Sequence, residues 1–315
     1  MNTDYQWQGR QDGTTTEHLR IHQIIGPVNP AAPGVVLVGF ASDEGVARNN
    51  GRIGAKEAPN LIRAQLAGLP IHQPTPLYDA GTVACEAHDL EGAHQQLSQA
   101  VSSLLAGQHF PIVLGGGHEV AFGSFSGLFD YVQNHQPERT IGIINFDAHF
   151  DLRENDVASS GTPFLQAAKL SSDHEQPFHY LCLGVAEHAN TAVLFQRAEA
   201  LGCDYVLDHD MTERNLAALI AKIDAFVAKV DLLYVTIDLD VFPYYQAPGV
   251  SAPAPLGVDL RLVQTLLKHI VASTKVAVFD VAEYNPKFDQ DHHTAKLAAF
   301  LIYQVITQVT AQKHK

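Results

Sequence analysis

Two short blocks of the sequence combine aspartate and histidine at the spacing of a metal-binding site. The first contains Asp147, His149 and Asp151, the second contains Asp238 and Asp240, and each follows an apolar run. Alternate residues of a β-strand point to the same side, so each block would gather its side chains on one side if it were extended. One divalent cation could not neutralise so many carboxylates, and the blocks therefore predict that more than one ion is bound.

A histidine that follows three glycines, His118, supplies a further ligand of the same kind. The combined set offers four carboxylates and two imidazoles, about the shell that two divalent cations sharing carboxylates require: His118, Asp147, His149, Asp151, Asp238 and Asp240. Oxygen and imidazole ligands without thiolate favour manganese or a similar ion over structural zinc. Two such ions lower the pKa of a shared water molecule, so the set predicts a hydrolase.

Each motif has a simpler interpretation when it is taken alone. The sequence at 115–118 could be a tight turn with an incidental histidine, and no G-K-S/T follows that would make it a P-loop. The block at 147–151 could cap a helix or bind a single cation. The second pair, Asp238 and Asp240, argues against these readings, because carboxylates after a buried strand are costly unless a cation compensates them.

The composition is that of a soluble globular protein and excludes several classes of function. Hydrophobic residues make up 46% and charged residues 17% of the chain, which argues against disorder. The formal net charge of -14 argues against nucleic acid or an anionic membrane as the main partner. Residues 1–10 lack the apolar core of a signal peptide. The three isolated cysteines, Cys85, Cys182 and Cys203, fit a reduced compartment, so we expect a cytoplasmic protein.

Apolar runs that alternate with helix-like stretches predict an α/β fold. The runs are continuous, as expected for a parallel sheet covered on both faces: 34–40, 111–114, 140–146, 180–185, 232–237 and 276–281. The helix-like stretches are 58–66, 90–106, 192–200, 215–227, 260–272 and 294–312. We predict a three-layer α/β/α sandwich with a mainly parallel sheet, formed as one domain by residues 1–315. The site is expected at the carboxyl ends of its strands.

Four motifs, at 115–118, 147–151, 238–242 and 283–286, resemble the successive signatures of the arginase, or ureohydrolase, family and occur in the same order. Each is weak alone, but the four together are highly specific. The resemblance implies a hydrolase with two Mn2+ per subunit that cleaves the C–N bond of a guanidine or amidine. It also places the six residues given above on the family's metal-ligand positions.

Sequence beside these motifs resembles the formimidoylglutamase branch of the family. Residues 159–164 contain no histidine where arginases and agmatinases carry one, and Arg153 stands where arginases have asparagine. Residues 43–55, 184–191 and 248–253 also fit this branch. The implied reaction is N-formimidoyl-L-glutamate plus water giving L-glutamate and formamide, a step of histidine degradation.

The resemblance suggests roles for further side chains. Asp151 would relay a proton to the leaving nitrogen, and Glu283 would hold the amidinium. Arg153 offers a bidentate partner for a substrate carboxylate. Contacts to the two carboxylates are also expected from Arg48, Arg52, Asn190 and Thr191.

These roles have structural alternatives. Glu283 could brace the end of a strand. Arg48 and Arg52 could be solvated charges or partners in internal salt bridges. Asn190 and Thr191 could cap the helix predicted at 192–200 by accepting hydrogen bonds from its free backbone N–H groups.

Three other functions fit parts of the pattern. Another ureohydrolase, acting on agmatine, arginine or a guanidino acid, is disfavoured by the missing histidine and by Arg153. A dimetal phosphoesterase also uses paired aspartate and histidine, but nothing else in the sequence supports it. A catalytically inactive regulator would usually have lost metal ligands, and all six are present. The family resemblance further implies a homo-oligomer with a small-molecule substrate.

Overall fold

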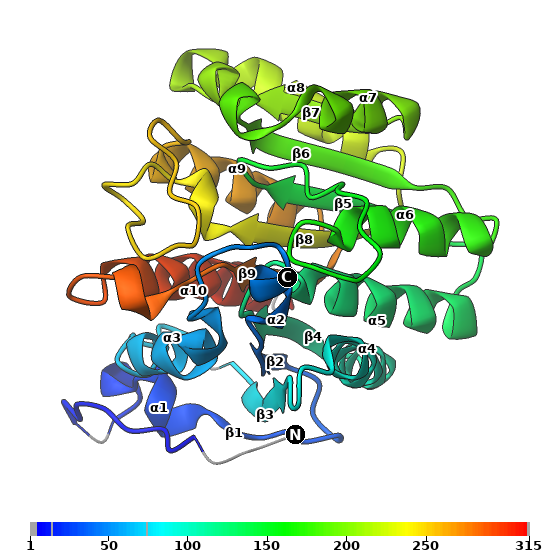
Figure 1. Ribbon diagram of the computed structural model, residues 1–315. Helices are drawn as coiled ribbons and strands as arrows, with labels where there is room; N and C mark the ends of the chain where they lie inside the picture. Colours follow the sequence, from blue (N-terminus) through cyan, green and yellow to red (C-terminus); the bar gives the residue numbers. More distant parts are fainter. Residues whose placement is uncertain (1–4, 14, 74, 314–315) are drawn as a thin grey trace.

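The computed structural model describes residues 5–13, 15–73 and 75–313, and its centre is a nine-stranded sheet (Figure 1). The strand order is β1-β3-β2-β4-β9-β8-β5-β6-β7, and every named pair is parallel. The strands are β1 Gly26–Pro27, β2 Val35–Ala41, β3 Leu77–Ala84, β4 Phe110–Leu114, β5 Ile141–Phe146, β6 His179–Val185, β7 Asp204–Leu207, β8 Leu232–Asp238 and β9 Val276–Ala282.

Helices cover both faces of this sheet, which makes the fold a three-layer α/β/α sandwich. They are α1 Ile21–Ile24, α2 Glu44–Arg48, α3 Ala58–Ala67, α4 Leu90–Ala106, α5 Val120–His135, α6 Pro163–Asp173, α7 Ala192–Ala200, α8 Leu216–Val227, α9 Leu260–Ala272 and α10 His293–Lys313. Apolar residues of α3, α8, α9 and α10 form one core with one face of the strands. Residues of α4, α5, α6 and α7 form a second core with the opposite face.

The strands in the middle of the sheet confirm the pattern of continuous apolar runs. Along β8, Leu233 and Val235 belong to one core while Tyr234 belongs to the other, so alternate side chains of a fully buried strand are all shielded from water. The predicted runs coincide with β2, β4, β5, β6, β8 and β9 to within about a residue or two at each end. The strands β1, β3 and β7 lie toward the sheet margins, where the sequence is less apolar, and the run pattern did not predict them.

Helix α5 was also not predicted, and its glycines explain why. Gly123 and Gly127 interrupt the helical sequence and lower its intrinsic helix propensity. A Cβ at Gly123 would lie 2.7 Å from Leu97 Cδ2, and one at Gly127 would lie 2.6 Å from Val101 Cβ. The glycines therefore allow α5 to pack closely against α4, and this tertiary contact outweighs the unfavourable propensity.

None of the described helices is long and apolar enough to span a membrane, and all three cysteines are free. The loops at the carboxyl ends of β4, β5, β8 and β9 meet because these strands are neighbours in the sheet. The sequence motifs lie on these four loops.

Candidate metal centre

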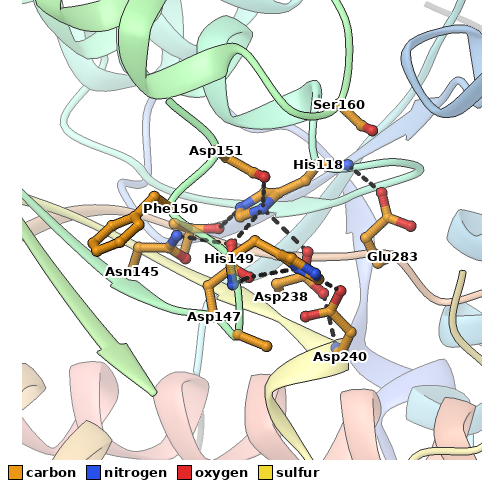
Figure 2. Close-up of polar contacts among 12 residues, drawn as sticks. His118, Asn145, Asp147, His149, Phe150, Asp151, Ser160, Asp238, Asp240 and Glu283 are labelled. Atoms are coloured by element: carbon orange, nitrogen blue, oxygen red, sulfur yellow. Dashed lines mark hydrogen bonds and ion pairs between the residues drawn. The ribbon is translucent and has the colours of Figure 1, made fainter. Parts of the chain in front are cut away.

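The side chains predicted to bind metal lie together at the carboxyl ends of three strands from the middle of the sheet, β4, β5 and β8 (Figure 2). His118 follows β4, Asp147 follows β5 and Asp238 is the last residue of β8. Glu283 follows β9, which lies between β4 and β8. The edge of an open parallel sheet where the strands end is the usual place for a binding site, and the structure puts the cluster there.

The reason expected for this convergence was wrong, because neither aspartate block is extended. β5 ends at Phe146, and Asp151 has a φ of 48°, in the left-handed region. Beyond Asp238 the chain forms a short 3-10 helix, η6, over Leu239–Val241. Asp147 Oδ1 accepts a hydrogen bond from the His149 N–H at 2.7 Å. Asp238 Oδ1 accepts one from the backbone N–H two residues later at 2.8 Å, so the blocks gather their side chains by turning.

The first group of candidate ligands surrounds the His118 imidazole. Its Nδ1 lies 3.1 Å from Asp147 Oδ2, 2.9 Å from Asp151 Oδ2 and 3.1 Å from Asp238 Oδ2. Neighbouring ligand atoms around an octahedral ion with bonds of about 2.1 Å lie about 3 Å apart. The four atoms therefore have the spacing of adjacent ligands around one cation.

The second group is centred on His149 and shares Asp147 with the first. His149 Nδ1 lies 3.1 Å from Asp240 Oδ2 and 3.5 Å from Asp147 Oδ1. The two oxygens of Asp147 thus face different histidines. A carboxylate in this position can bridge two ions, and the structure brings all six predicted ligands into two groups joined by that bridge.

Burial and mutual repulsion disfavour the charged carboxylates of the cluster, and a bound cation would offset both effects. Burial, and then the neighbouring Asp240, raises the pKa of Asp238 well above its usual value. Burial and the charge of Asp147 raise the pKa of Asp151. Burial alone would lower the pKa of His118, but the three carboxylates around it raise that pKa well above its ordinary value.

The cluster contains buried polar atoms without hydrogen-bond partners, and bound metal ions would satisfy these atoms better than protons would. His118 Nδ1 is buried and, although three carboxylate oxygens lie close, it makes no hydrogen bond of standard geometry with any described group. Asp240 Oδ1 is also buried without a partner among the described residues. Divalent cations bind deprotonated carboxylates and neutral imidazoles, so two ions would satisfy these atoms and remove the repulsion. The donor set of carboxylates and imidazoles without thiolate suits manganese.

Glu283 lies beside this centre, in the left-handed region with a φ of 67°. Its Oε1 accepts a hydrogen bond from the His118 backbone N–H at 2.8 Å, and its Oε2 is buried with no partner among the described groups. Burial and the nearby Glu119 raise its pKa to about 8. Side chains in strained backbone positions often mark functional sites. Glu283 therefore does brace the loop after β4, as the structural alternative held, and it also keeps one carboxylate oxygen for another partner.

Arg153 is exposed at the margin of the centre, and its guanidinium makes no hydrogen bond or ion pair with the residues that the structure describes. Its backbone N–H donates to the carbonyl of Gly161 at 2.8 Å. A Cβ at Gly161 would lie 2.6 Å from Arg153 Cδ, so the glycine leaves room for the arginine side chain. Arg153 is thus available to a ligand, and its role in substrate binding stays a prediction.

Arg48 has its donors engaged within the protein. Its Nε lies 3.0 Å from Glu44 Oε1 and its Nη1 lies 2.7 Å from Glu91 Oε1. It also donates to the carbonyls of Ala158 and His88, at 3.1 Å and 2.9 Å. These contacts match the structural alternative of an internal salt bridge and fasten α2 to the loop at 153–161.

Arg52 also has donors engaged within the protein. It donates to the carbonyls of Ser251 and Val250 at 2.8 Å and 2.6 Å, and its guanidinium carbon lies 3.6 Å from the centre of the Phe288 ring. The two arginines were predicted to contact the substrate. The structure brings both to the loops around the centre but gives them protein partners there.

Asn190 is buried and braces the ligand loop after β5. Its Oδ1 accepts from the Phe150 N–H at 3.0 Å, and its Nδ2 donates to the carbonyls of Ala148 and Ala186 at 2.8 Å and 2.9 Å. Thr191 is exposed at the N-cap of α7 and makes no side-chain capping bond. Contact of either residue with a substrate stays a prediction.

Two sets of polar residues around the centre were not predicted from the sequence. Asn49 Nδ2 donates to Ser160 Oγ at 3.2 Å, which joins residues 43–55 to the histidine-free segment at 159–164. Behind His118 lie Thr236 and Asp280, both fully buried in the sheet. Thr236 could have been found by counting two residues back from Asp238, since alternate strand residues share a face.

The chain is similar to known sequences over nearly its full length. The sequence profile of the arginase family matches residues 33–307. The formimidoylglutamase of Aeromonas hydrophila subsp. hydrophila is 54% identical over 305 residues, which cover 95% of this chain and 96% of that protein.

Solved structures with the same fold cover most of the chain. A crystal structure of formimidoylglutamase from Bacillus subtilis superposes with a TM-score of 0.82 at 21% identity, covering 99% of this chain and 96% of that one. At this identity the likeness concerns the fold. A crystal structure of Trypanosoma cruzi formiminoglutamase with two Mn2+ superposes with a TM-score of 0.79 at 26% identity, covering 90% of this chain and 95% of that one.

Proposed function

The chain belongs to the arginase family, and we propose that it hydrolyses N-formimidoyl-L-glutamate to L-glutamate and formamide with two manganese ions as cofactors. The observation that carries this proposal is the arrangement of two buried ligand groups that share Asp147, with the unpartnered Oε2 of Glu283 beside them. The 54% identity to a formimidoylglutamase over nearly the full length supports this substrate over a guanidine.

His118, Asp147, Asp151 and Asp238 would hold one ion, and Asp147, His149 and Asp240 would hold the other. When bound, the pair supplies a water molecule activated for attack at neutral pH and an electrophile for the amidine. Manganese is proposed because of the oxygen and imidazole donors and because the T. cruzi relative carries it.

The residues of the chain can then be given roles in the reaction. Glu283 accepts an N–H of the cationic formimidoyl group through Oε2, while its Oε1 stays bonded to the His118 N–H. The oxygen of water adds to the formimidoyl carbon, and the bond from that carbon to the glutamate nitrogen breaks. Asp151 relays the two protons of the water, one after the other, to this leaving nitrogen, which departs as the ammonium group of glutamate, while the formimidoyl group with the water oxygen becomes formamide.

Arg153 is proposed to bind one carboxylate of the substrate, because it is the described arginine at the centre whose guanidinium has no protein partner. Asn49 and Ser160, which are bonded to each other, lie next to Gly161 and Arg153 and can add neutral hydrogen bonds. Arg48 and Arg52 hold the surrounding loops in place and support this site indirectly.

The proposal extends to the setting of the reaction. A step that releases glutamate and formamide from this substrate belongs to histidine degradation, and we propose a cytoplasmic location because the three cysteines are free. One domain formed by residues 1–315 and a homo-oligomeric assembly remain predictions.

The test is a comparison of substrates with purified protein loaded with manganese. N-formimidoyl-L-glutamate, arginine, agmatine, guanidinobutyrate and a generic phosphate ester are incubated in parallel. The proposal predicts release of glutamate and formamide from the first alone. Urea release from any guanidine, at a rate comparable to that of the first substrate, would overturn the assignment, and phosphate release would favour a phosphoesterase.

A further inference from the structure

Behind His118, on the face of the sheet covered by α5, lies a row of buried polar side chains that the mechanism above does not use. Thr236 of β8 and Asp280 of β9 are partners in the register of these parallel strands. Tyr234 lies two residues before Thr236 and therefore on the same face. All three side chains are 0% exposed, and Ser124 of α5 packs above them with the same exposure.

The row begins at the imidazole. His118 Nε2 lies 3.1 Å from Thr236 Oγ1, while Nδ1 faces the carboxylates of the metal centre. An imidazole nitrogen that binds a cation carries no proton, so a neutral His118 with Nδ1 on an ion must carry its proton on Nε2. Thr236 Oγ1 is then the acceptor, and its own hydroxyl proton must point to a different group.

The row ends at a carboxylate with one oxygen still without a donor. Asp280 Oδ2 accepts hydrogen bonds from Ser124 Oγ at 2.6 Å and from the Tyr234 hydroxyl at 2.7 Å. Asp280 Oδ1 is buried and forms no hydrogen bond of standard geometry with a described group. Thr236 is the neighbour of Asp280 across the two paired strands, and both side chains are buried on the same face. The Thr236 hydroxyl therefore lies beside a carboxylate that has an oxygen free to accept its proton.

The charge of this carboxylate needs an explanation, since no lysine or arginine among the described residues pairs with Asp280. A buried and unpaired carboxylate is costly unless a positive charge compensates it. The imidazole connected through Thr236 faces the metal centre with its other nitrogen. An ion bound to Nδ1 would polarise the His118 ring and make its Nε2 proton a stronger donor to Thr236. The positive charge of that ion would offset the negative charge of Asp280.

We propose that Thr236 and Asp280 are positioning residues that hold His118 with its proton on Nε2 and thereby strengthen binding of the ion in the His118 group. The inference rests on the two-ion centre of the proposed function. Residues that orient a metal-binding histidine in this way typically change metal affinity by about 10- to 100-fold when they are removed. Because the row touches His118 and not His149, one of the two ions should be affected and the other spared.

The experiment titrates manganese into metal-free full-length protein by competition with a chelating indicator, at fixed pH, with bound ions counted by electron paramagnetic resonance. The variants are Thr236→Val, which keeps the shape without the hydroxyl, Thr236→Ser, which restores it, and Asp280→Asn, which keeps the size without the charge. Ser98→Ala is the matched control, because it removes another buried hydroxyl that donates to an aspartate, Asp130, at a place that contains none of the candidate ligands. Circular dichroism and thermal melting of the metal-free proteins report folding.

The proposal expects two tight ions in the wild type and the control, and a loss of about 10- to 100-fold in the affinity of one ion in Thr236→Val and Asp280→Asn, with recovery in Thr236→Ser. Wild-type affinities in a folded Thr236→Val protein would overturn the proposed positioning role of Thr236 and Asp280. The proposal of a two-ion centre would be unaffected by that result. If Thr236→Val fails to fold, a folded Asp280→Asn protein with both affinities unchanged overturns the positioning role equally. A wild type that binds no manganese would overturn the proposed metal centre and the row with it.

Discussion

The backbone N–H of His118 donates to Glu283 Oε1 at 2.8 Å, so the first metal-binding loop and the carboxylate proposed to hold the substrate are joined directly. The bond connects the loops after β4 and β9, which are neighbouring strands. It fixes one oxygen of Glu283 and leaves the other, Oε2, buried without a described partner. The position of Glu283 relative to the candidate ligand His118 is therefore fixed by the sheet itself.

Replacing Glu283 by glutamine should separate its two roles. The amide oxygen can still accept from the His118 N–H, so metal binding and folding should be close to wild type. The charge opposite the cationic formimidoyl group is lost, and a charge-assisted contact of this kind contributes about 2 to 4 kcal/mol, so kcat/KM should fall by about 30- to 1000-fold. Steady-state kinetics with matched manganese content measure the change. A variant that keeps a third of wild-type activity would exclude the proposed role.

Arg153 and Arg48 should respond differently to removal. Arg153→Gln should raise KM for the substrate by about tenfold or more with little change in melting temperature, because one charged contact to a carboxylate is lost. Arg48→Gln should lower the melting temperature first, because Arg48 joins Glu44, Glu91 and two backbone carbonyls. Thermal melting and substrate saturation curves of the two variants test this. The reverse pattern would return Arg48 to the substrate and remove Arg153 from it.

Asp238→Ala should leave the metal-free protein folded, and even somewhat more stable, while it abolishes most manganese binding and activity. Asp238 is 2% exposed, and burial together with Asp240 raises its pKa, so without a cation it is an unfavourable charge. Metal content by elemental analysis and melting of the metal-free protein measure both effects. Unchanged metal content would contradict the ligand assignment. A collapse of the metal-free fold would show that Asp238 acts as a structural residue.

His94 should make the metal-free protein sensitive to acid. Burial lowers its pKa from 6.5 to about 4 in the folded state, so the unfolded chain takes up a proton first as the pH falls. The neutral ring therefore contributes stability that is complete above pH 6.5 and is lost between 6.5 and 4, by about 3 kcal/mol. Its ring stacks on Phe40, so phenylalanine is a suitable replacement. Urea unfolding of wild type and His94→Phe at pH 7 and 4 measures the difference, and parallel losses of stability in the two proteins would count against it.

The fold could be predicted from the sequence where a strand is buried on both faces. β5 and β8 read as continuous apolar runs because both cores require it. α5 could not be predicted, since the close contact of Gly123 with Leu97 is a tertiary feature. Residue types and motif order led to six candidate ligands that the structure brings together, but the reason given for their convergence was wrong. Asp151 and Asp240 reach the centre because the chain turns within each block. The alternation of side chains along an extended strand does not describe these turns.

The substrate-binding residues were the least predictable part of the site. An arginine in a loop sequence carries no sign of whether its donors are already engaged. Arg52 is bonded to two carbonyls nearly two hundred positions away in the chain, whereas Arg153 makes no such contact among the described residues. Asn190 lies in the segment 184–191 that resembles formimidoylglutamases, but its side-chain amide is already hydrogen-bonded to three backbone groups.

Product analysis by nuclear magnetic resonance shows which C–N bond of the substrate is broken. Manganese-loaded protein is incubated with N-formimidoyl-L-glutamate, and the products are followed with time. Glutamate and formamide are expected in equal amounts, because the bond from the formimidoyl carbon to the glutamate nitrogen breaks. Formation of N-formylglutamate and ammonia, or no turnover by a protein that binds two manganese ions, would contradict it.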